Sequence, residues 1–135
     1  MYKNILIPIA PDHGEIFATA YDVARQLADD GAKITALTVI EAVPGFAAQY
    51  LPEGQHEKTK GSVSEILKAV VGAAENVATE VVSGHSGQSI LDYAHANKID
   101  CIVIASHRPG LKDFFLGSTA ARVVRFFKGS VHVLR

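Results

Sequence analysis

The sequence predicts an α/β domain with a mostly parallel five-stranded sheet and helices on both faces. Two observations support this prediction. Five short apolar runs alternate with four stretches of helical periodicity, and parallel strands need crossover connections, which are right-handed. In addition, 135 residues with 48% hydrophobic and 20% charged residues are typical of one globular domain. We therefore expect residues 1–135 to form a single domain.

The five strands are predicted from short runs rich in β-branched residues. These runs are 4–10 (NILIPIA), 33–40 (KITALTVI), 76–83 (NVATEVVS), 101–106 (CIVIAS) and 130–135 (SVHVLR). Nearly every position of the first and fourth runs is apolar, which is typical of strands covered on both faces.

The first two helices are predicted from apolar residues at helical spacing. Residues 15–29 have one apolar face, made of Ile16, Ala20, Val23, Ala24 and Leu27. We expect Gly31 to close this helix. Residues 62–74 have an apolar stripe, made of Val63, Ile66, Leu67, Val70 and Val71. Here Ser62 or Ser64 is the expected N-cap.

The last two helices follow the same reasoning. Residues 88–97 have one apolar face, made of Ile90, Leu91 and Ala94. Residues 118–127 have another, made of Ala121, Val124 and Phe127, before Gly129. The one long segment without periodicity is 41–61, with two prolines and three glycines, and such segments tend to be functional or mobile.

Composition excludes several classes of function. The net charge is −1, so no global field draws the chain to nucleic acid or to an anionic membrane. No run approaches the ~18 apolar residues of a membrane span, and the N-terminal run is interpreted as a strand, not a signal peptide. Cys101 is the only cysteine, which excludes an internal disulfide and predicts an inert core thiol. The six histidines lack metal-ligand spacing, so no metal site is expected. We expect a cytoplasmic protein.

A ligand site is predicted where the strand order of such a sheet reverses. For the order 3-2-1-4-5, the reversal lies beyond the carboxyl ends of the first and fourth strands. The segments that leave the sheet there are 9–14 (IAPDHG) and 105–110 (ASHRPG).

The loop after the fourth strand ends in Gly117-Ser118-Thr119, directly before a predicted helix. A helix N-terminus has free N–H groups and about half a positive charge, so it attracts phosphate. Gly117 allows close approach of an anion, and Arg108 and Lys112 add positive charge. The alternative is that the hydroxyls only cap the helix and the glycine only makes a turn. Neither G-x-x-x-x-G-K-[ST] nor G-x-G-x-x-G is present.

The whole chain resembles the universal stress proteins. The resemblance lies in ILIPIA, in LTVIEAVP and in IVIASHRPGLKDFFLGSTAARVVRFFKGSVHVLR. It implies a Rossmann-like domain with a five-stranded parallel sheet in the order 3-2-1-4-5. It also implies binding of ATP or AMP, with or without Mg²⁺, because many members of the family bind these nucleotides.

The chain departs from the glycine pattern of the nucleotide-binding members, which is a glycine, two residues, a glycine, nine residues and then Gly-Ser or Gly-Thr. Ala105 and Arg108 replace the first two glycines, and the spacing to Gly117 is one residue shorter. The pattern SHRPxxxxxxLGSxAxxVVR resembles a subgroup that also binds nucleotide. There, the Arg108 guanidinium would replace a backbone contact with phosphate.

A second departure concerns the base. The family often has an aspartate at the end of the first strand that accepts a hydrogen bond from the adenine amino group. Here Ala10 stands at that position, with Asp12 two residues further on. We therefore expect base recognition by backbone groups of Ile9 and Val39.

The resemblance and the loop together define the predicted nucleotide-binding residues. They are Pro8, Ile9, Ala10, Val39, Ala105, His107, Arg108, Gly117, Ser118, Thr119 and Ala120. His107 is expected at the ribose or phosphate, with loop packing as its alternative role.

The sequence offers no nucleophile, general base or paired carboxylates that converge on this loop, so no catalytic residue is predicted. We expect a nucleotide-responsive regulatory protein rather than an enzyme. Two alternatives stay open: a dimeric interaction protein of the family that binds no nucleotide, and a slow ATPase.

The last strand ends the chain and forms an exposed edge, which invites pairing. Val131 and Val133 offer it an apolar face, and the family resemblance points to a homodimer through this strand. The further protein partner is unknown.

Overall fold

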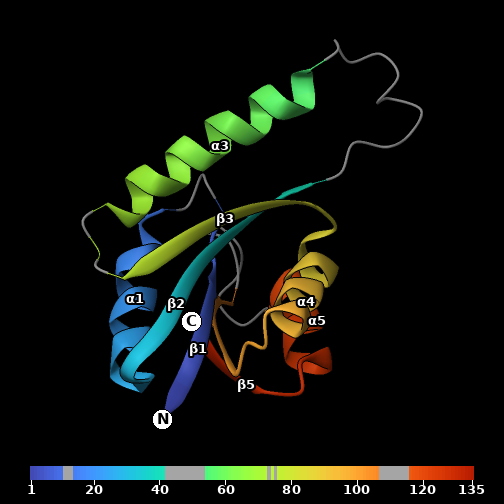
Figure 1. Ribbon diagram of the computed structural model, residues 1–135. Helices are drawn as coiled ribbons and strands as arrows, with labels where there is room; N and C mark the ends of the chain where they lie inside the picture. The colour runs from blue at the N-terminus through green and yellow to red at the C-terminus, as the bar shows by residue number, and fades with distance from the viewer. Residues whose placement is uncertain (11–13, 42–53, 73, 75, 107–115) are drawn as a thin grey trace.

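The computed structural model describes residues 1–10, 14–41, 54–72, 74, 76–106 and 116–135 (Figure 1). Its elements follow the predicted alternation of strand and helix. They are β1 (Tyr2–Pro8), α1 (Ile16–Leu27), β2 (Ala28–Glu41), α3 (Gln55–Val71), β3 (Val77–Gly84), α4 (Ser86–Ala96), β4 (Cys101–Ala105), α5 (Ser118–Phe126) and β5 (Ser130–Leu134). No helix in these ranges is long and apolar enough to cross a membrane.

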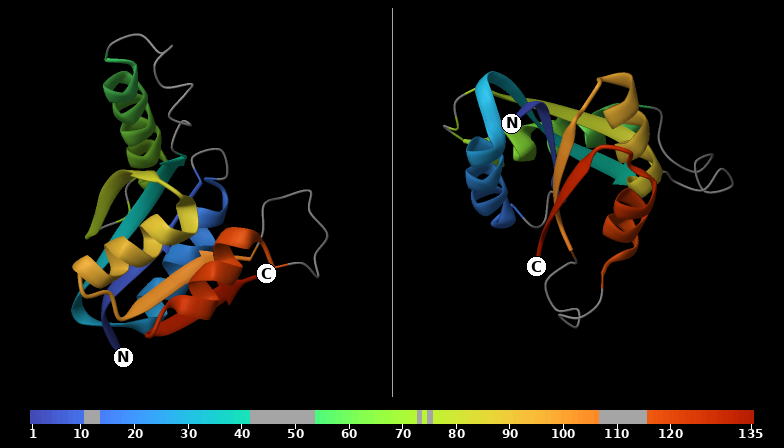
Figure 2. Two further views of the ribbon diagram at one scale, coloured as in Figure 1. Left: turned by 90° about the vertical axis from the view of Figure 1, so that its right-hand side faces the viewer. Right: turned by 90° about the horizontal axis from the view of Figure 1, so that it is seen from below.

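The sheet has the predicted order, β3-β2-β1-β4-β5, and all of its neighbouring strands are parallel. Helices α1 and α3 cover one face, and α4 and α5 cover the other (Figures 1 and 2). The strand order reverses between β1 and β4, so the fold confirms the predicted class. In sheets of this kind, ligands bind beyond the carboxyl ends of the two strands at the reversal.

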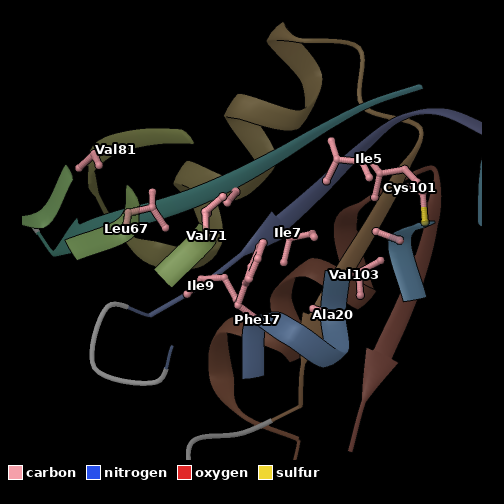
Figure 3. Close-up of a cluster of buried hydrophobic side chains, with 13 residues drawn as sticks. Ile5, Ile7, Ile9, Phe17, Ala20, Leu67, Val71, Val81, Cys101 and Val103 are labelled. Atoms are coloured by element: carbon pink, nitrogen blue, oxygen red, sulfur yellow. The ribbon is translucent and has the colours of Figure 1, made fainter. Parts of the chain in front are cut away.

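The core has two halves because successive side chains of a strand point to opposite faces. On β1, Ile5 and Ile7 pack toward α1 and α3, whereas Leu6 packs toward α4 and α5. Figure 3 shows the first half, where Phe17 of α1 lies beside Ile7 and Ile9. Burial on both faces explains why the first and fourth runs are apolar at nearly every position.

Cys101 lies at the start of β4 and is 1% exposed, as expected for a core thiol. Burial, with a smaller contribution from the nearby Asp100 carboxylate, raises the pKa of this thiol to about 11. The nucleophilic thiolate is therefore scarce at neutral pH.

Asp100 holds together the amino edge of the sheet, by which we mean the end of the sheet where its parallel strands begin. Its carboxylate accepts hydrogen bonds from the backbone N–H groups of Lys3 (2.8 Å) and Asn4 (3.0 Å). Its own N–H donates to the Asn4 carbonyl (3.0 Å), and its carbonyl accepts from the Ser130 N–H (3.2 Å). Asp100 thus ties the starts of β1 and β5 to the start of β4.

Side chains complete this edge. The Tyr2 hydroxyl donates to Ser130 Oγ (2.7 Å), and Asn4 Nδ2 donates to the Asn97 carbonyl (2.7 Å). Asn4 Oδ1 is the exception, because it is buried without a hydrogen-bond partner among the described residues.

Helix α3 begins seven residues earlier than the periodicity predicts. It starts at Gln55, after Gly54 in a left-handed conformation (φ +81°), so neither Ser62 nor Ser64 is its N-cap. The first turns, QHEKTKG, are polar and have no apolar stripe to detect. Ile66 was expected on the buried stripe, but it is 46% exposed.

The connection between α1 and β2 also differs from the prediction. Helix α1 ends at Leu27 and β2 begins at Ala28, so Gly31 does not close the helix, although it has a positive φ of 78°. Ala28 already pairs with Tyr2, and the register shifts before Asn4 pairs with Lys33. An irregular pairing of this kind leaves no periodic pattern in the sequence.

Helix α5 presents a different face to the core from the one predicted. Ala120 and Val123 are buried, Phe127 after the helix is partly buried, and Val124 is 44% exposed. In a nine-residue helix, a register error of one position rotates the apparent face by about 100°, and few apolar residues are available to reveal it.

Candidate functional site

The carboxyl end of β1 is fixed to β2 by two hydrogen bonds at Ile9. The Ile9 N–H donates to the Leu37 carbonyl (2.8 Å), and the buried Thr38 hydroxyl donates to the Ile9 carbonyl (2.8 Å). Both backbone groups of Ile9 are thus engaged, and only the second lone pair of its carbonyl remains for a ligand. Pro8 ends the strand before Ile9, and Ala10 after it is half-buried.

Val39 lies where β2 continues beyond the end of β1. Pro8 pairs with Leu37, and the Leu37 carbonyl accepts from the β1 side. Along a parallel strand, the backbone groups of alternate residues point to the same neighbour. The N–H and carbonyl of Val39 therefore face the space beyond Ile9, as base recognition by the backbone requires.

The carboxyl end of β4 is connected to both β5 and α5. Ala105 pairs with Leu134, and the next residue, Ser106, is 1% exposed. The Ser106 N–H donates to the Leu134 carbonyl (2.7 Å), and the Ser106 carbonyl accepts from the Gly117 N–H (2.6 Å). The start of α5 is thereby held beside the end of β4, as Figure 2 also shows.

Among the described residues, no side chain caps the N-terminus of α5. Gly117 is the N-cap residue, in an extended conformation (φ −60°, ψ 157°), and no carboxylate lies in the first turn. Ser118 is exposed, Thr119 is half-buried and Ala120 is buried. Gly117, not Ser118 or Thr119, is thus the N-cap residue, and no side chain in the described part of the chain accepts from the first-turn N–H groups.

The glycine at position 117 is not required by backbone strain, because its φ is negative. What distinguishes it from the usual N-cap residues, Ser, Thr, Asp and Asn, is the absence of a side-chain oxygen. A glycine at the N-cap therefore offers the first-turn donors no acceptor of its own side chain, and an external anion can serve as one.

The structure brings most of the predicted site residues to the carboxyl edge of the sheet, that is, the end where its parallel strands finish. Pro8, Ile9 and Ala10 lie at the end of β1, and Val39 lies on the projecting part of β2. At the end of β4 are Ala105 and the residues at the start of α5, which are Gly117, Ser118, Thr119 and Ala120. His107, Arg108 and Lys112, like Asp12, lie outside the described residues.

Three residues of this edge were not singled out from the sequence. Thr38 and Ser106 are two of the three buried polar residues in the described part of the chain, and Leu134 accepts the hydrogen bond from Ser106. The only signal for Thr38 is a hydroxyl within an apolar strand. Ser106 and Leu134 act through the backbone, which the sequence does not reveal.

A separate hollow of about 1130 Å³ lies at the opposite edge, between α1 and the starts of β2 and β3. Its lining combines Arg25 and Lys33 with Asp29 and Asp30, and Asp29 pairs with the amino group of Met1. These mixed charges favour no single ligand class, whereas the start of α5 favours anions.

Fold and site together define a class: a doubly wound α/β protein with an anion-receptive helix N-terminus at the switch point of its sheet. A model of the universal stress protein family matches residues 1–135. A universal stress protein of Methanocaldococcus jannaschii is 31% identical over 133 residues, which cover 93% of this chain and 77% of the relative. The chain belongs to the universal stress protein family.

Two solved structures resemble the chain in fold. One is a universal stress protein in complex with cAMP, with a TM-score of 0.61, 22% identity and coverage of 99% of this chain and 97% of the other. The second is the universal stress protein from Archaeoglobus fulgidus in complex with dAMP, with a TM-score of 0.55, 16% identity and coverage of 99% and 98%.

Proposed function

We propose that this protein binds ATP or AMP, with or without Mg²⁺, at the carboxyl ends of β1 and β4, and acts as a nucleotide-responsive regulatory dimer in the cytoplasm. The observation that carries the proposal is the start of α5, where Gly117 caps the helix without a side chain and no acidic residue follows in the first turn. The dAMP and cAMP complexes of two proteins with the same fold support an adenine nucleotide.

Each part of the nucleotide has a place in this proposal. The phosphates accept hydrogen bonds from the first-turn N–H groups of α5 and from the hydroxyls of Ser118 and Thr119. Arg108 adds a charge-assisted contact. The base contacts the apolar surface of Pro8, Ile9 and Ala10 and the backbone of Val39.

Calorimetric titration of the purified protein with ATP, AMP and adenosine tests the proposal. Nucleotide released on denaturation must first be measured by chromatography, so that the titration starts from an empty site. We expect ATP and AMP to bind more tightly than adenosine, because adenosine lacks the phosphates. Absence of binding up to millimolar Mg-ATP, with no co-purified nucleotide, would contradict the proposal.

The alternative is a dimeric interaction protein that binds no nucleotide. It is favoured by the hydrogen bonds that already engage both backbone groups of Ile9, and by Ala105 and Arg108 in place of glycines. The same titration separates the two hypotheses, because this alternative expects heat from none of the three compounds.

Catalysis forms no part of the proposed function, since no reacting geometry is evident among the described residues. Slow ATP hydrolysis is the competing hypothesis. Its test is phosphate release by the wild-type protein against a Ser118→Ala variant of equal purity. Equal rates would remove hydrolysis as a property of this site.

The dimer is proposed through β5. Ser130 and Leu134 direct backbone groups toward β4, since Ser130 donates to Asp100 and Leu134 accepts from Ser106. The alternating residues Val131 and Val133 therefore direct theirs to the free edge. Their side chains pack in part against the cluster beneath α4 and α5.

Light scattering on a Val133→Pro variant tests this edge. Proline removes an N–H that points away from β4, and edge strands tolerate it there. We expect the wild type to be a dimer and the variant a folded monomer, with Val133→Thr as the control that keeps the N–H. A monomeric wild type would refute the dimer, and a dimeric Val133→Pro variant would refute this interface.

A further inference from the structure

Ser106 connects three elements through a single residue. Its N–H donates to the Leu134 carbonyl near the end of β5, and its carbonyl accepts from the N-cap residue of α5, Gly117. Both hydrogen bonds are short, at 2.7 and 2.6 Å, and Ser106 is shielded from water at 1% exposure. Water therefore cannot readily replace either partner.

The position of the first-turn donors of α5 depends on this connection. Because the Gly117 N–H is directed to Ser106, the donors left for an anion belong to the residues that follow it. Hydrogen bonds weaken steeply with misalignment, and a binding group displaced by more than about 0.5 Å loses much of its effect. The residue that fixes Ser106 therefore also sets the geometry of these donors.

Leu134 of β5 is the residue that fixes Ser106, because its carbonyl accepts the hydrogen bond from the Ser106 N–H. It is the register partner of Ala105, and among the described strands β5 pairs with β4 alone. Its side chain is half-buried against the core on the α1 side. Leu134 thus has two separable roles: a side chain in the core, and a carbonyl directed to the end of β4.

We propose that Leu134 is a positioning residue for the phosphate end of the nucleotide site, acting through its backbone carbonyl and Ser106 on Gly117. This inference rests on the proposed function, because it names the group that holds that site in its binding geometry. Leu134 then determines affinity for phosphate without contacting the ligand.

The experiment compares four proteins: the full chain, a variant that ends at Val133, a variant that ends at Leu134, and the full chain with Leu134→Ala. Ending at Val133 removes the carbonyl and the side chain. Ending at Leu134 removes Arg135 and its interaction but keeps the Leu134 carbonyl oxygen as part of the terminal carboxylate, and Leu134→Ala removes only the side chain. Titration with ATP and with adenosine gives the affinities, and circular dichroism establishes that each variant is folded.

We expect the variant that ends at Val133 to bind ATP about tenfold more weakly, as for the loss of one well-placed charge-assisted hydrogen bond. Its affinity for adenosine should change by less than about twofold, because adenosine lacks the group that α5 holds. Both controls should keep the affinity of the full chain for ATP. Unchanged ATP affinity in the variant that ends at Val133, or an equal loss of ATP affinity in Leu134→Ala, would overturn the inference.

Amide hydrogen exchange without nucleotide provides a second readout. Loss of the Leu134 carbonyl should speed exchange at the Gly117 amide by about tenfold or more relative to both controls, because its acceptor residue is no longer fixed. Unchanged exchange would also overturn the inference. If the full chain binds no nucleotide, the proposed function itself fails, whereas binding with no effect of truncation refutes only the role of Leu134.

Discussion

The amino edge and the carboxyl edge of the sheet differ in how side chains satisfy their backbone polar groups. At the amino edge, the Asp100 carboxylate accepts from two N–H groups at the start of β1, and the Tyr2 hydroxyl reaches Ser130. At the carboxyl edge, Ile9 and Ser106 are also hydrogen-bonded, but α5 begins at Gly117, which has no side chain to cap the helix. Among the described residues, side chains thus satisfy the backbone at the amino edge, whereas none caps the start of α5 at the carboxyl edge, where ligands bind in sheets of this kind.

This difference predicts that substitutions at the two edges affect different properties. Carboxyl-edge changes should lower nucleotide affinity with little effect on stability, and amino-edge changes should do the reverse. Four substitutions test the contrast in order of decreasing effect.

Gly117→Asp should have the largest effect. Aspartate is a favourable N-cap residue, so the variant should be as stable as the wild type or slightly more stable. Its carboxylate accepts hydrogen bonds from the first-turn N–H groups and repels phosphate. ATP affinity should therefore fall roughly a hundredfold, which corresponds to the loss of about two charged hydrogen bonds. Calorimetry and thermal melting measure the two effects. Gly117→Asn, which caps without charge, should lose less, and unchanged ATP affinity in Gly117→Asp would end the phosphate assignment.

Asp100→Ala should have the largest effect at the amino edge. It removes the acceptor of the Lys3 and Asn4 N–H groups. The free energy of unfolding should fall by about 2 kcal/mol, because these are charge-assisted hydrogen bonds that are partly open to solvent. Urea denaturation measures this loss, and Asp100→Asn should recover part of it. The contrast between the edges would break down if ATP affinity fell as much as stability.

Arg108→Ala tests a residue outside the described part of the chain. If its guanidinium contacts phosphate, ATP affinity should fall about tenfold or more, with little change in melting temperature. The conservative variant Arg108→Lys keeps the charge but not the bidentate geometry, so it should recover only part of the affinity. Equal losses for ATP and adenosine would instead indicate a general distortion of the pocket.

Thr38→Val should have the smallest effect, and it qualifies the contrast. It leaves the buried Ile9 carbonyl without its hydroxyl donor, which should destabilise the fold by about 1 kcal/mol. Nucleotide affinity should change little, since Thr38 holds Ile9 at the end of β1, away from the start of α5 where the phosphates are proposed to bind. Thr38→Ser, which keeps the donor, is the control in urea denaturation. A large loss of ATP affinity would show that the two sides of the crevice are not independent.

The sequence predicts the fold well where burial imposes a pattern. The runs around Ile5 and Ile102 are apolar throughout because both faces of β1 and β4 are covered. Prediction of the fold from the sequence fails where burial imposes no pattern on the residues. The first turns of α3 are polar, and the early pairing of Ala28 with Tyr2 depends on a contact between distant residues.

The same distinction applies to the candidate site, because the sequence reveals some of its residues and not others. Gly117, Ser118 and Thr119 are recognisable because a glycine and two hydroxyl residues begin a helix after a buried strand. The supports of the site are not recognisable. Ser106 and Leu134 contribute backbone groups that every residue except proline has in full, and the role of Thr38 depends on the distance between β1 and β2.

The position of Leu134 in the chain has a consequence for biosynthesis. β1 pairs with β4, which is nearly a hundred residues later in sequence, and the support of Gly117 comes from Leu134, later still. Long-range pairing of this kind is slow, and a chain folds as it leaves the ribosome from its N-terminus. On a nascent chain, β1, β2 and β3 are available early, but the start of α5 acquires its support only when β5 emerges. Competence to bind phosphate should therefore appear on a nascent chain only after β5 has emerged, later than the pairing of β1, β2 and β3.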